Sequence, residues 1–345
     1  MNKKMKSENQ LELLINDIVA IHTQARVYAV RLVNDALVQA NWEVGKRIVE
    51  DEQGGKATAE YGKKTLTLLS NELTQKLGKG YSRSNLQNMR LFYLKYPNCQ
   101  TLSGKLTWSH YCELIYIEDE SARQFYEIEA IAAGWGVKEL KRQINTSLFE
   151  RLLLSKGTDH KAELLALAQK GQIIEKPQDI LKNPYIFEFL GIAEEKTFLE
   201  SDLEKRLIRH IEDFLLELGK GFMYVGSQQR ITIDNVHYYV DMVFYNKILR
   251  CYVLIDLKMG KLEHNHIGQM NLYLNYYKAE VNDEIDQAPI GIILCQAKNE
   301  VMVEYALGGL SNHIFASKYL YYIPEKETLI REIEKLQTLK NHKKP

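Results

Sequence analysis

The feature that most constrains this chain is a change of pattern between its two halves. Through residue 155, apolar residues recur at intervals of three and four, which is typical of amphipathic helices. From residue 199 onward, runs rich in β-branched and aromatic residues appear between helical segments, which indicates strands. We therefore expect an all-α amino-terminal domain followed by an α/β carboxy-terminal domain.

The breaks between apolar segments set the limits of the expected amino-terminal helices. A first long pattern begins at Leu11 and continues to Trp42, and glycine or proline pairs interrupt the chain after it. Further helices are expected at Thr65–Leu77, Arg83–Tyr96, Ser109–Tyr116, Glu120–Ala133 and Lys138–Leu154.

A polar break at 156–159, followed by Pro177 and Pro184, marks the predicted domain boundary. A short helix, Lys161–Lys170, is expected inside this region. We predict a helical domain at 1–155, a linker region at 156–190, a second domain at 191–338 and a basic tail at 339–345.

The second domain is predicted to open with an amphipathic helix from Leu203 to Leu218, which ends at a glycine pair. Strands are expected at Phe222–Ile233, Tyr238–Tyr245, Arg250–Lys258, Ile290–Cys295 and Tyr319–Ile323, with helices at Ile267–Lys278 and Val301–Leu307. Asp234-Asn235 and Asn246-Lys247 suit hairpin turns between the first three strands. This order predicts a mixed sheet with helices on both faces.

Composition narrows the class of protein. Lys plus Arg and Asp plus Glu both number 45, so the whole chain has no net charge that would indicate a polyanionic partner. No apolar run reaches the roughly 18 residues that a membrane span needs, and no secretory signal is evident. The four cysteines lack metal-site spacing. We expect a cytoplasmic protein with no membrane partner, and self-association is left open.

Acidic residues in two of the predicted strands carry the chemical signal. Asp256 and Lys258 stand two apart in an apolar strand, so their side chains share one face, and Asp241 interrupts the strand paired with it. Two carboxylates about 4 Å apart repel by roughly 4 kcal/mol at an effective dielectric near 20. A divalent cation offsets that repulsion, and oxygen ligands favour Mg²⁺ or Mn²⁺. The alternative is a structural Asp256–Lys258 ion pair with Asp241 at a strand end.

The residues around these acids resemble a known family. Asp241, then Asp256-Leu257-Lys258, on a hairpin between two helices resembles the PD-(D/E)XK nucleases of restriction-endonuclease-like fold. The surrounding sequence is similar to the bacterial YhcG family of nucleases. The similar segments are 218–222, 239–245 and 268–277, and in the helical half 80–90, 106–110 and 125–130. One departure is Val240, where the broader superfamily has a proline before the first Asp.

The resemblance implies roles for several residues. Asp241 and Asp256 would hold the metal together with the Leu257 carbonyl oxygen, and Lys258 would orient or deprotonate the attacking water. Gln269, on the following helix, corresponds to a polar residue that similar nucleases place near the scissile phosphate. A solvated helix residue is an equal alternative for Gln269.

Glu204 is a third carboxylate candidate for the metal, because it falls on the apolar face of the preceding helix. Its alternative is an ordinary acid in the first turn of that helix. His264 and His266 are interpreted as loop or phosphate contacts rather than metal ligands.

A basic stretch in the helical half indicates a second function. Between Glu72 and Glu113 there is no acidic residue, although six Lys or Arg residues lie there, in a helix–glycine turn–helix outline. Arg83, Gln87 and Arg90 share the outer face of the second helix with Asn88 beside them, and such side chains read bases and phosphates. A solvated basic helix or a protein interface is the alternative.

Together these features favour a metal-dependent nuclease that hydrolyses DNA delivered by its helical domain. The main rival is a catalytically silent DNA- or protein-binding module that retains a nuclease fold.

Overall fold

A computed structural model gives the fold and describes residues 2–54, 59–98, 104–156, 160–192, 199–297 and 313–341. The chain divides into two compact units: Met1–Arg123 with Ala130–Leu140, and Gln124–Glu129 with Lys141–Pro345. The predicted helix Val301–Leu307 lies outside the described residues. No described helix is both long and apolar enough to cross a bilayer.

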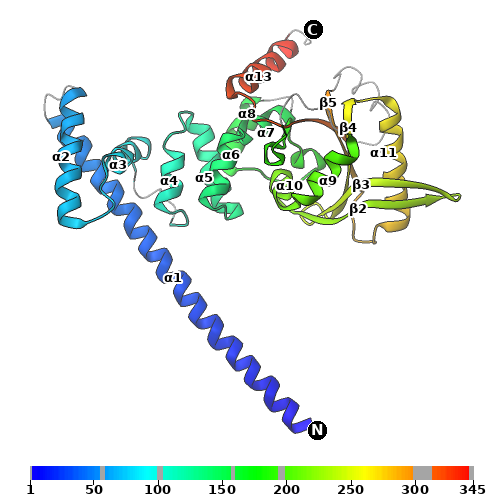
Figure 1. Cartoon of the computed structure of the whole chain (residues 1–345), viewed down its shortest axis with the longest axis horizontal. Helices are drawn as coiled ribbons and strands as arrows, with labels where there is room; N and C mark the ends of the chain where they lie inside the picture. Colours follow the sequence, from blue (N-terminus) through cyan, green and yellow to red (C-terminus); the bar gives the residue numbers. More distant parts are fainter. Residues whose placement is uncertain are drawn as a thin grey trace. The chain divides into compact units, whose positions relative to one another are not determined.

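Among the described residues of the first unit, all regular structure is helical (Figure 1). The helices are α1 (Asn2–Gly54), α2 (Ala59–Leu77), α3 (Arg83–Lys95), α4 (Trp108–Leu114) and parts of α5 (Glu120–Ala133) and α6 (Val137–Asn145). The side chains of Ile48, Leu66, Leu86 and Met89 bury the contact between α1, α2 and α3. Helix α3 begins at the N-cap Ser82, whose hydroxyl accepts a hydrogen bond from the Asn85 N–H.

The helix predicted at Lys138–Leu154 is in fact two helices, α6 and α7 (Leu148–Lys156). Ser147 between them has φ +53°, a conformation that a helix cannot continue through. The buried Arg151 side chain donates through Nε to the Thr146 carbonyl oxygen, which holds this break in place. The helical spacing of apolar residues continues across Ser147, so the sequence does not reveal this break.

The second unit is built on a six-stranded sheet in the order β1-β6-β5-β4-β3-β2. Strands β1, β6, β5 and β4 are mutually parallel, whereas β3 and β2 continue the sheet antiparallel, so the predicted mixed sheet is confirmed. The strands are β1 (Tyr185–Ile186), β2 (Phe222–Ile233), β3 (Val236–Asn246), β4 (Cys251–Lys261), β5 (Ile290–Ala297) and β6 (Ile314–Leu320). Asp234 and Asn235 both have positive φ, as the predicted β2–β3 turn requires.

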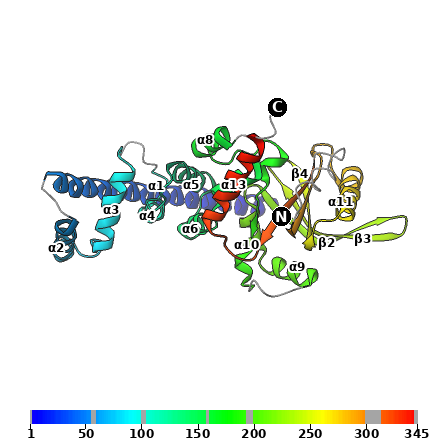
Figure 2. The same ribbon diagram turned by 90° about the horizontal axis from the view of Figure 1, so that it is seen from above.

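Helices cover both faces of this sheet (Figures 1 and 2). On one face, α9 (Glu200–Arg209) and α10 (Ile211–Leu218) pack on Val253, Ile255 and Leu257 of β4. On the other face, α11 (His264–Tyr276) packs on Leu254 and on neighbouring residues of β3 and β5. Helix α11 continues into a π-helical turn, Tyr277–Val281. The side chains of β4 therefore alternate between the two faces as the sequence predicts.

The single helix predicted from Leu203 to Leu218 is divided into α9 and α10, because His210 leaves helical geometry with ψ 37°. The last strand also differs from its prediction at Tyr319–Ile323. Strand β6 lies earlier in the chain because Ile314 to Lys318 pair with β5, and Tyr319 and Leu320 pair with β1.

The segment expected to be a linker, 156–190, contains helix α8 (His160–Lys170), a 3₁₀ turn (Pro177–Ile180) and β1. Tyr185 and Phe187 lie fully buried in the core of the sheet unit. A two-residue strand shows no alternation, so the sequence could not reveal that this segment joins the sheet. Helix α13 (Lys326–Asn341), which the sequence did not predict, extends into the segment expected to be a basic tail.

Candidate active site

The sheet register places Asp241 and Asp256 opposite each other. Strands β3 and β4 pair antiparallel from Asn246↔Cys251 to Met242↔Ile255, and the next pair in this register is Asp241 with Asp256. The backbone ladder stops there. The Leu257 N–H, which would otherwise face the backbone of β3, donates instead to Asp241 Oδ2 at 2.8 Å. A carboxylate therefore ends the ladder, and we call Asp241 and Asp256 the acidic pair.

Lys258 lies against the acidic pair and connects it to α9. Its Nζ is 2.9 Å from Asp256 Oδ2 and 3.1 Å from Glu200 Oε1. Asp256 and Lys258 thus share one face of β4, as their spacing predicts. Asp256 is 2% exposed, so this negative charge has little access to water. The Lys258 ammonium group therefore interacts electrostatically with three carboxylates, those of Asp256, Glu200 and Asp241.

The electrostatic effect of this arrangement is to favour protons on the acids. Burial and the negative charge of Asp256 raise the pKa of Asp241 to about 7, although the Leu257 N–H and Lys258 act in the opposite direction. Burial likewise raises the pKa of Asp256 in spite of Lys258. Burial alone would lower the pKa of Lys258, but Asp256, Glu200 and Asp241 outweigh it and raise that pKa. When both acids are ionised, the single protonated lysine therefore does not offset their negative charge.

The acidic pair has the chemistry of a partial cation site. Buried Asp256 Oδ2 receives no hydrogen bond of ordinary geometry among the described residues, although the Lys258 ammonium lies close to it. Such an oxygen suits a hard divalent cation such as Mg²⁺ or Mn²⁺. Within the described ranges, however, no three His, Cys, Asp or Glu side chains stand together as a ready ligand set. The pair fits a metal that takes its remaining oxygens from backbone, water or substrate.

Gln228 of β2 joins the acidic pair to Glu204 of α9. Its Nε2 donates to Glu204 Oε2 at 2.8 Å and lies 3.4 Å from Asp241 Oδ1. Gln228 is opposite Asp241 in the β2–β3 register and has φ +47°, which is unusual for a residue with a side chain. Burial raises the pKa of Glu204, and Asp241 adds to that rise. Glu204 is thus placed beside the acidic pair rather than at a merely solvated helix end.

Gln269 and the two histidines lie on α11. Gln269 Nε2 donates to the Tyr273 hydroxyl at 2.5 Å, and that hydroxyl donates to the Tyr239 carbonyl oxygen at 3.0 Å. Gln269 is therefore tied to the strand that carries Asp241. His266 Nδ1 accepts from the Glu263 N–H and caps the helix, and burial together with Lys258 lowers the His266 pKa. His264 is exposed at the start of the helix.

Comparison with known proteins identifies the family. Residues 178–334 match the YhcG PDDEXK nuclease domain, and residues 17–151 match the DUF1016 N-terminal domain. The chain is 37% identical over 354 aligned positions to the protein named "Putative nuclease YhcG" from Escherichia coli (strain K12), with 93% of each chain covered. The chain belongs to the YhcG family. The resemblance stated from the sequence is confirmed.

Two solved structures are similar to the YhcG-family chain at a much lower level. A repair endonuclease from Pyrococcus abyssi is 17% identical with a TM-score of 0.26, covering 36% of this chain and 49% of that one. The structure titled "EndoMS-dsDNA2 complex" gives the same identity and TM-score, covering 39% and 50%. The YhcG-family chain thus spans about half the length of each, and a TM-score this low says nothing about its activity.

Two residues beside the acidic pair escaped the sequence prediction. Glu200 contacts Lys258 and stands four residues before Glu204, so both acids lie on one face of α9. That spacing was a usable signal. Gln228 gave no such signal, because a glutamine in an exposed strand has no distinctive pattern. Its position follows from the β2–β3 register, which shifts between Tyr224 and Gly226.

The predicted nucleic-acid residues of α3 differ in their surroundings. Arg83 is exposed and forms no ion pair with any described residue. Arg90 instead donates through Nε to both carboxylate oxygens of Glu52 in α1, at 3.0 and 2.7 Å. Asn88 accepts from the Tyr116 hydroxyl and donates to Cys112 Sγ. Gln87 is half-buried. Of the two arginines, Arg83 is thus the one more available to a ligand.

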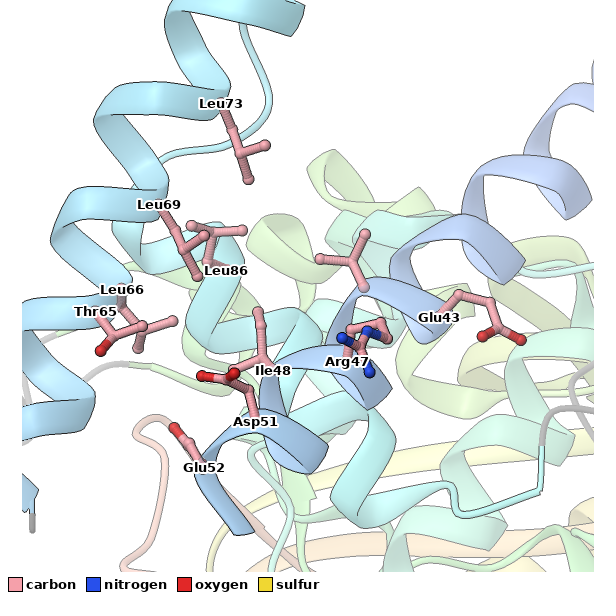
Figure 3. A pocket seen from close by; sticks show the side chains of 11 residues that line it. Glu43, Arg47, Ile48, Asp51, Glu52, Thr65, Leu66, Leu69, Leu73 and Leu86 are labelled. Carbon is pink, nitrogen blue, oxygen red and sulfur yellow. The ribbon is translucent and has the colours of Figure 1, made fainter. Parts of the chain in front are cut away.

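Acids from outside the acid-free stretch neutralise much of its charge. Lys76 pairs with Glu72, and Lys95 pairs with Glu118 at 2.8 Å. Beside Glu52, the helices also form an open, mainly apolar cavity of about 480 Å³, lined by leucines of α2 and α3 and by Glu43, Asp51 and Arg47, so that acids outnumber the one arginine (Figure 3). These acids disfavour a phosphate there. The local excess of positive charge in the sequence is therefore much smaller in the folded unit.

Proposed function

We propose that this YhcG-family chain is a metal-dependent endonuclease that hydrolyses phosphodiester bonds of DNA. The observation that carries the proposal is the acidic pair: two carboxylates face each other where a backbone ladder ends, with a single lysine between them and α9. A fold gains nothing in stability from such uncompensated repulsion. The membership of residues 178–334 in a nuclease domain family supports the same reading.

In this proposal Asp241 and Asp256 hold Mg²⁺ or Mn²⁺ together with the Leu257 carbonyl oxygen, and Glu204 supplies a further carboxylate. When bound, such a cation lowers the pKa of a water molecule and stabilises negative charge on phosphate. Gln228 keeps Glu204 and Asp241 at a fixed spacing, because one amide group donates to both.

Lys258 acts in this proposal as a cation rather than as a base. The carboxylates around it raise its pKa in the metal-free protein, which supports an ammonium group rather than a free amine at this position. A protonated lysine beside the acidic pair orients a water molecule and stabilises the charge that develops on the phosphate oxygens. Gln269 is proposed to contact the same phosphate from α11, in the position that its link to Tyr273 fixes.

The helical unit is proposed to bind the DNA through the exposed part of α3. Arg83, with Gln87 beside it on the same helix, offers a donor set suited to phosphates and base edges. The helix–turn–helix role of α2 and α3 belongs to this proposal.

The test is a cleavage assay on duplex, branched and single-stranded DNA, with and without Mg²⁺ or Mn²⁺. Asp241→Ala, Asp256→Ala and Lys258→Ala should each lower the metal-dependent rate by about 100-fold or more. Asp202→Asn is a matched control, because this exposed acid lies on α9 and should leave the rate unchanged.

Two outcomes would count against the proposal. Cleavage that persists in all three variants would remove the acidic pair from the active site. DNA binding without cleavage of any substrate in either metal would instead favour the binding module with an inactive nuclease fold.

A further inference from the structure

The amino-terminal part of α1 exposes a long series of apolar side chains. From Leu11 to Val33 every residue of the helix is exposed, including its large hydrophobic ones. Leu14 is 55% exposed, Ile21 64% and Leu32 49%. Isolated apolar residues on a surface are ordinary, but a contiguous apolar face of this length marks a site of association.

Part of the exposed apolar set follows a heptad repeat, whereas Leu13, Val19, Val27, Val30 and Val33 lie outside it. Seven residues are spaced alternately by three and four, which is the a/d pattern of a coiled coil: Leu11, Leu14, Ile18, Ile21, Ala25, Tyr28 and Leu32. The f positions opposite the seam are occupied by the polar residues Asn16 and Thr23 and by one apolar residue, Val30. Helices with such a seam bury it against another helix of similar repeat, because each side chain then fills a gap between four others.

We propose that α1 pairs with α1 of a second copy of this chain in an antiparallel, two-fold symmetric coiled coil. In one alignment, centred on residue 23, Leu14 faces Leu32, Ile18 faces Tyr28 and Ile21 faces Ala25 of the other helix. Each pair occurs twice, because the two-fold axis repeats it. A self-complementary surface of this kind forms a closed dimer rather than an open chain of subunits.

Charges beside the seam select this alignment. With Leu11 at position a, the flanking g positions are occupied by Asp17, Gln24 and Arg31. Flanking g residues face one another across an antiparallel pair, so the alignment places Asp17 opposite Arg31 twice and Gln24 opposite Gln24. In a parallel pair, Asp17 and Arg31 would lie two heptads apart in the sequence and would not meet. Flanking charges of this kind set partner choice and orientation.

The e positions on the other side of the seam are compatible with the same alignment. Ile15 faces Ala29, and the two His22 side chains meet at the two-fold axis. No like-charged Asp, Glu, Lys or Arg pair arises at the flanking positions between residues 14 and 32. This inference concerns the helical unit alone and does not rest on the proposed nuclease function.

The experiment measures the mass of the full chain in solution by sedimentation or light scattering. The parent should have twice the chain mass of 40.1 kDa at micromolar concentration. Leu14→Asp combined with Ile21→Asp should return the mass to that of one chain. The matched control is Asn16→Asp combined with Thr23→Asp, which adds the same charges on the outer side of the helix and should leave the dimer intact.

A charge exchange tests the antiparallel alignment itself. Asp17→Arg and Arg31→Asp should each raise the dimer dissociation constant by about 3-fold or more, because each puts like charges opposite each other. The double variant should restore the parent value. A monomeric parent, or a dimer that survives Leu14→Asp with Ile21→Asp, would overturn the proposal. A dimer whose double charge variant is as weak as the single ones would overturn the antiparallel arrangement.

Discussion

Two of the places where the sheet unit buries carboxylates treat their charge in opposite ways. Glu217 of α10 is fully buried with three cations around it, which we call the Glu217 cluster. Arg151 donates to its Oε1 at 2.5 Å, Arg142 donates to its Oε2 at 3.2 Å, and Lys182 donates to its backbone carbonyl oxygen. The acidic pair has the reverse balance, with Lys258 as the cation in direct contact.

The contrast separates a structural charge from a chemical one. Burial by itself would raise the pKa of Glu217, but Arg151, Lys182 and Arg142 outweigh it and hold that pKa below its ordinary value. At the acidic pair, burial prevails and both pKa values rise. The Glu217 cluster is complete within the fold, whereas the acidic pair is deficient in positive charge. This deficit in a buried position is what the proposed cation would offset.

The largest expected effect is on the free energy of unfolding, when one carboxylate of the Glu217 cluster or of the acidic pair is replaced by an amide of the same shape. Glu217→Gln leaves buried arginines without their counter-charge, so we expect a loss of about 3–5 kcal/mol in the free energy of unfolding. Asp256→Asn relieves repulsion with Asp241, and Lys258 keeps Glu200 as a partner. That variant should be as stable as the parent or more stable. Guanidinium unfolding followed by circular dichroism measures both.

Comparable losses in the two variants would break the comparison, because the acidic pair would then be a structural ion pair like the Glu217 cluster. Asp202→Asn again provides the reference for an exposed acid on the same unit.

A divalent cation should supply the charge that the acidic pair lacks. Mg²⁺ or Mn²⁺ binds the folded state better than the unfolded chain, so it should raise the melting temperature. At 100 times the dissociation constant the stabilisation is about 2.7 kcal/mol. Thermal melts across a metal titration measure it. Asp256→Asn should abolish the shift, whereas Glu217→Gln should keep it. An equal shift in Asp256→Asn would place the metal elsewhere.

The two places should also respond to pH with opposite sign. The folded-state pKa of Asp241 is raised to about 7, so its contribution is favourable in acid and is lost as the pH rises through that value. The pKa of Glu217 is lowered, so its contribution is present above its unfolded value of about 4.3 and is lost as the pH falls below it. The metal-free protein should therefore melt at a higher temperature at pH 5.5 than at pH 8.

Two variants assign this pH dependence to its groups. Asp241→Asn should flatten the decline between pH 5.5 and pH 8, and Glu217→Gln should flatten the decline in acid. A metal-free melting temperature that rises from pH 5.5 to pH 8 would contradict the raised pKa of Asp241.

Sequence reasoning reached the parts of this site that local spacing determines. Two residues two apart in a strand must share a face, so Asp256 and Lys258 could be predicted together. The hairpin brought Asp241 to the same place. Gln228 and Glu200 were not predicted, because Gln228 reaches the site only through the β2–β3 register and Glu200 only through the face of α9 that it shares with Glu204. The two-residue strand β1 likewise depends on pairing with β6, which is distant in sequence.

Net charge in a stretch of sequence was the weakest guide, because it ignores acids that folding brings in. Arg90 counts as a free cation between Glu72 and Glu113, yet Glu52 of α1 binds it. The same contrast recurs in the helical unit. Arg90, like Glu217, has an opposite charge beside it, whereas Arg83, like the acidic pair, has charge that the fold does not neutralise.

The smallest expected effect is on the salt dependence of DNA binding, and it tests the difference between Arg83 and Arg90 of α3. Arg83→Gln should weaken DNA binding and flatten the dependence of log affinity on log salt by about 1, the value for one lost phosphate contact. Arg90→Gln should change that slope much less, because Glu52 already neutralises the guanidinium. Fluorescence anisotropy with a short duplex over a salt series measures both slopes. Equal changes would mean that DNA competes successfully for Arg90, and no change in either would move the DNA surface away from α3.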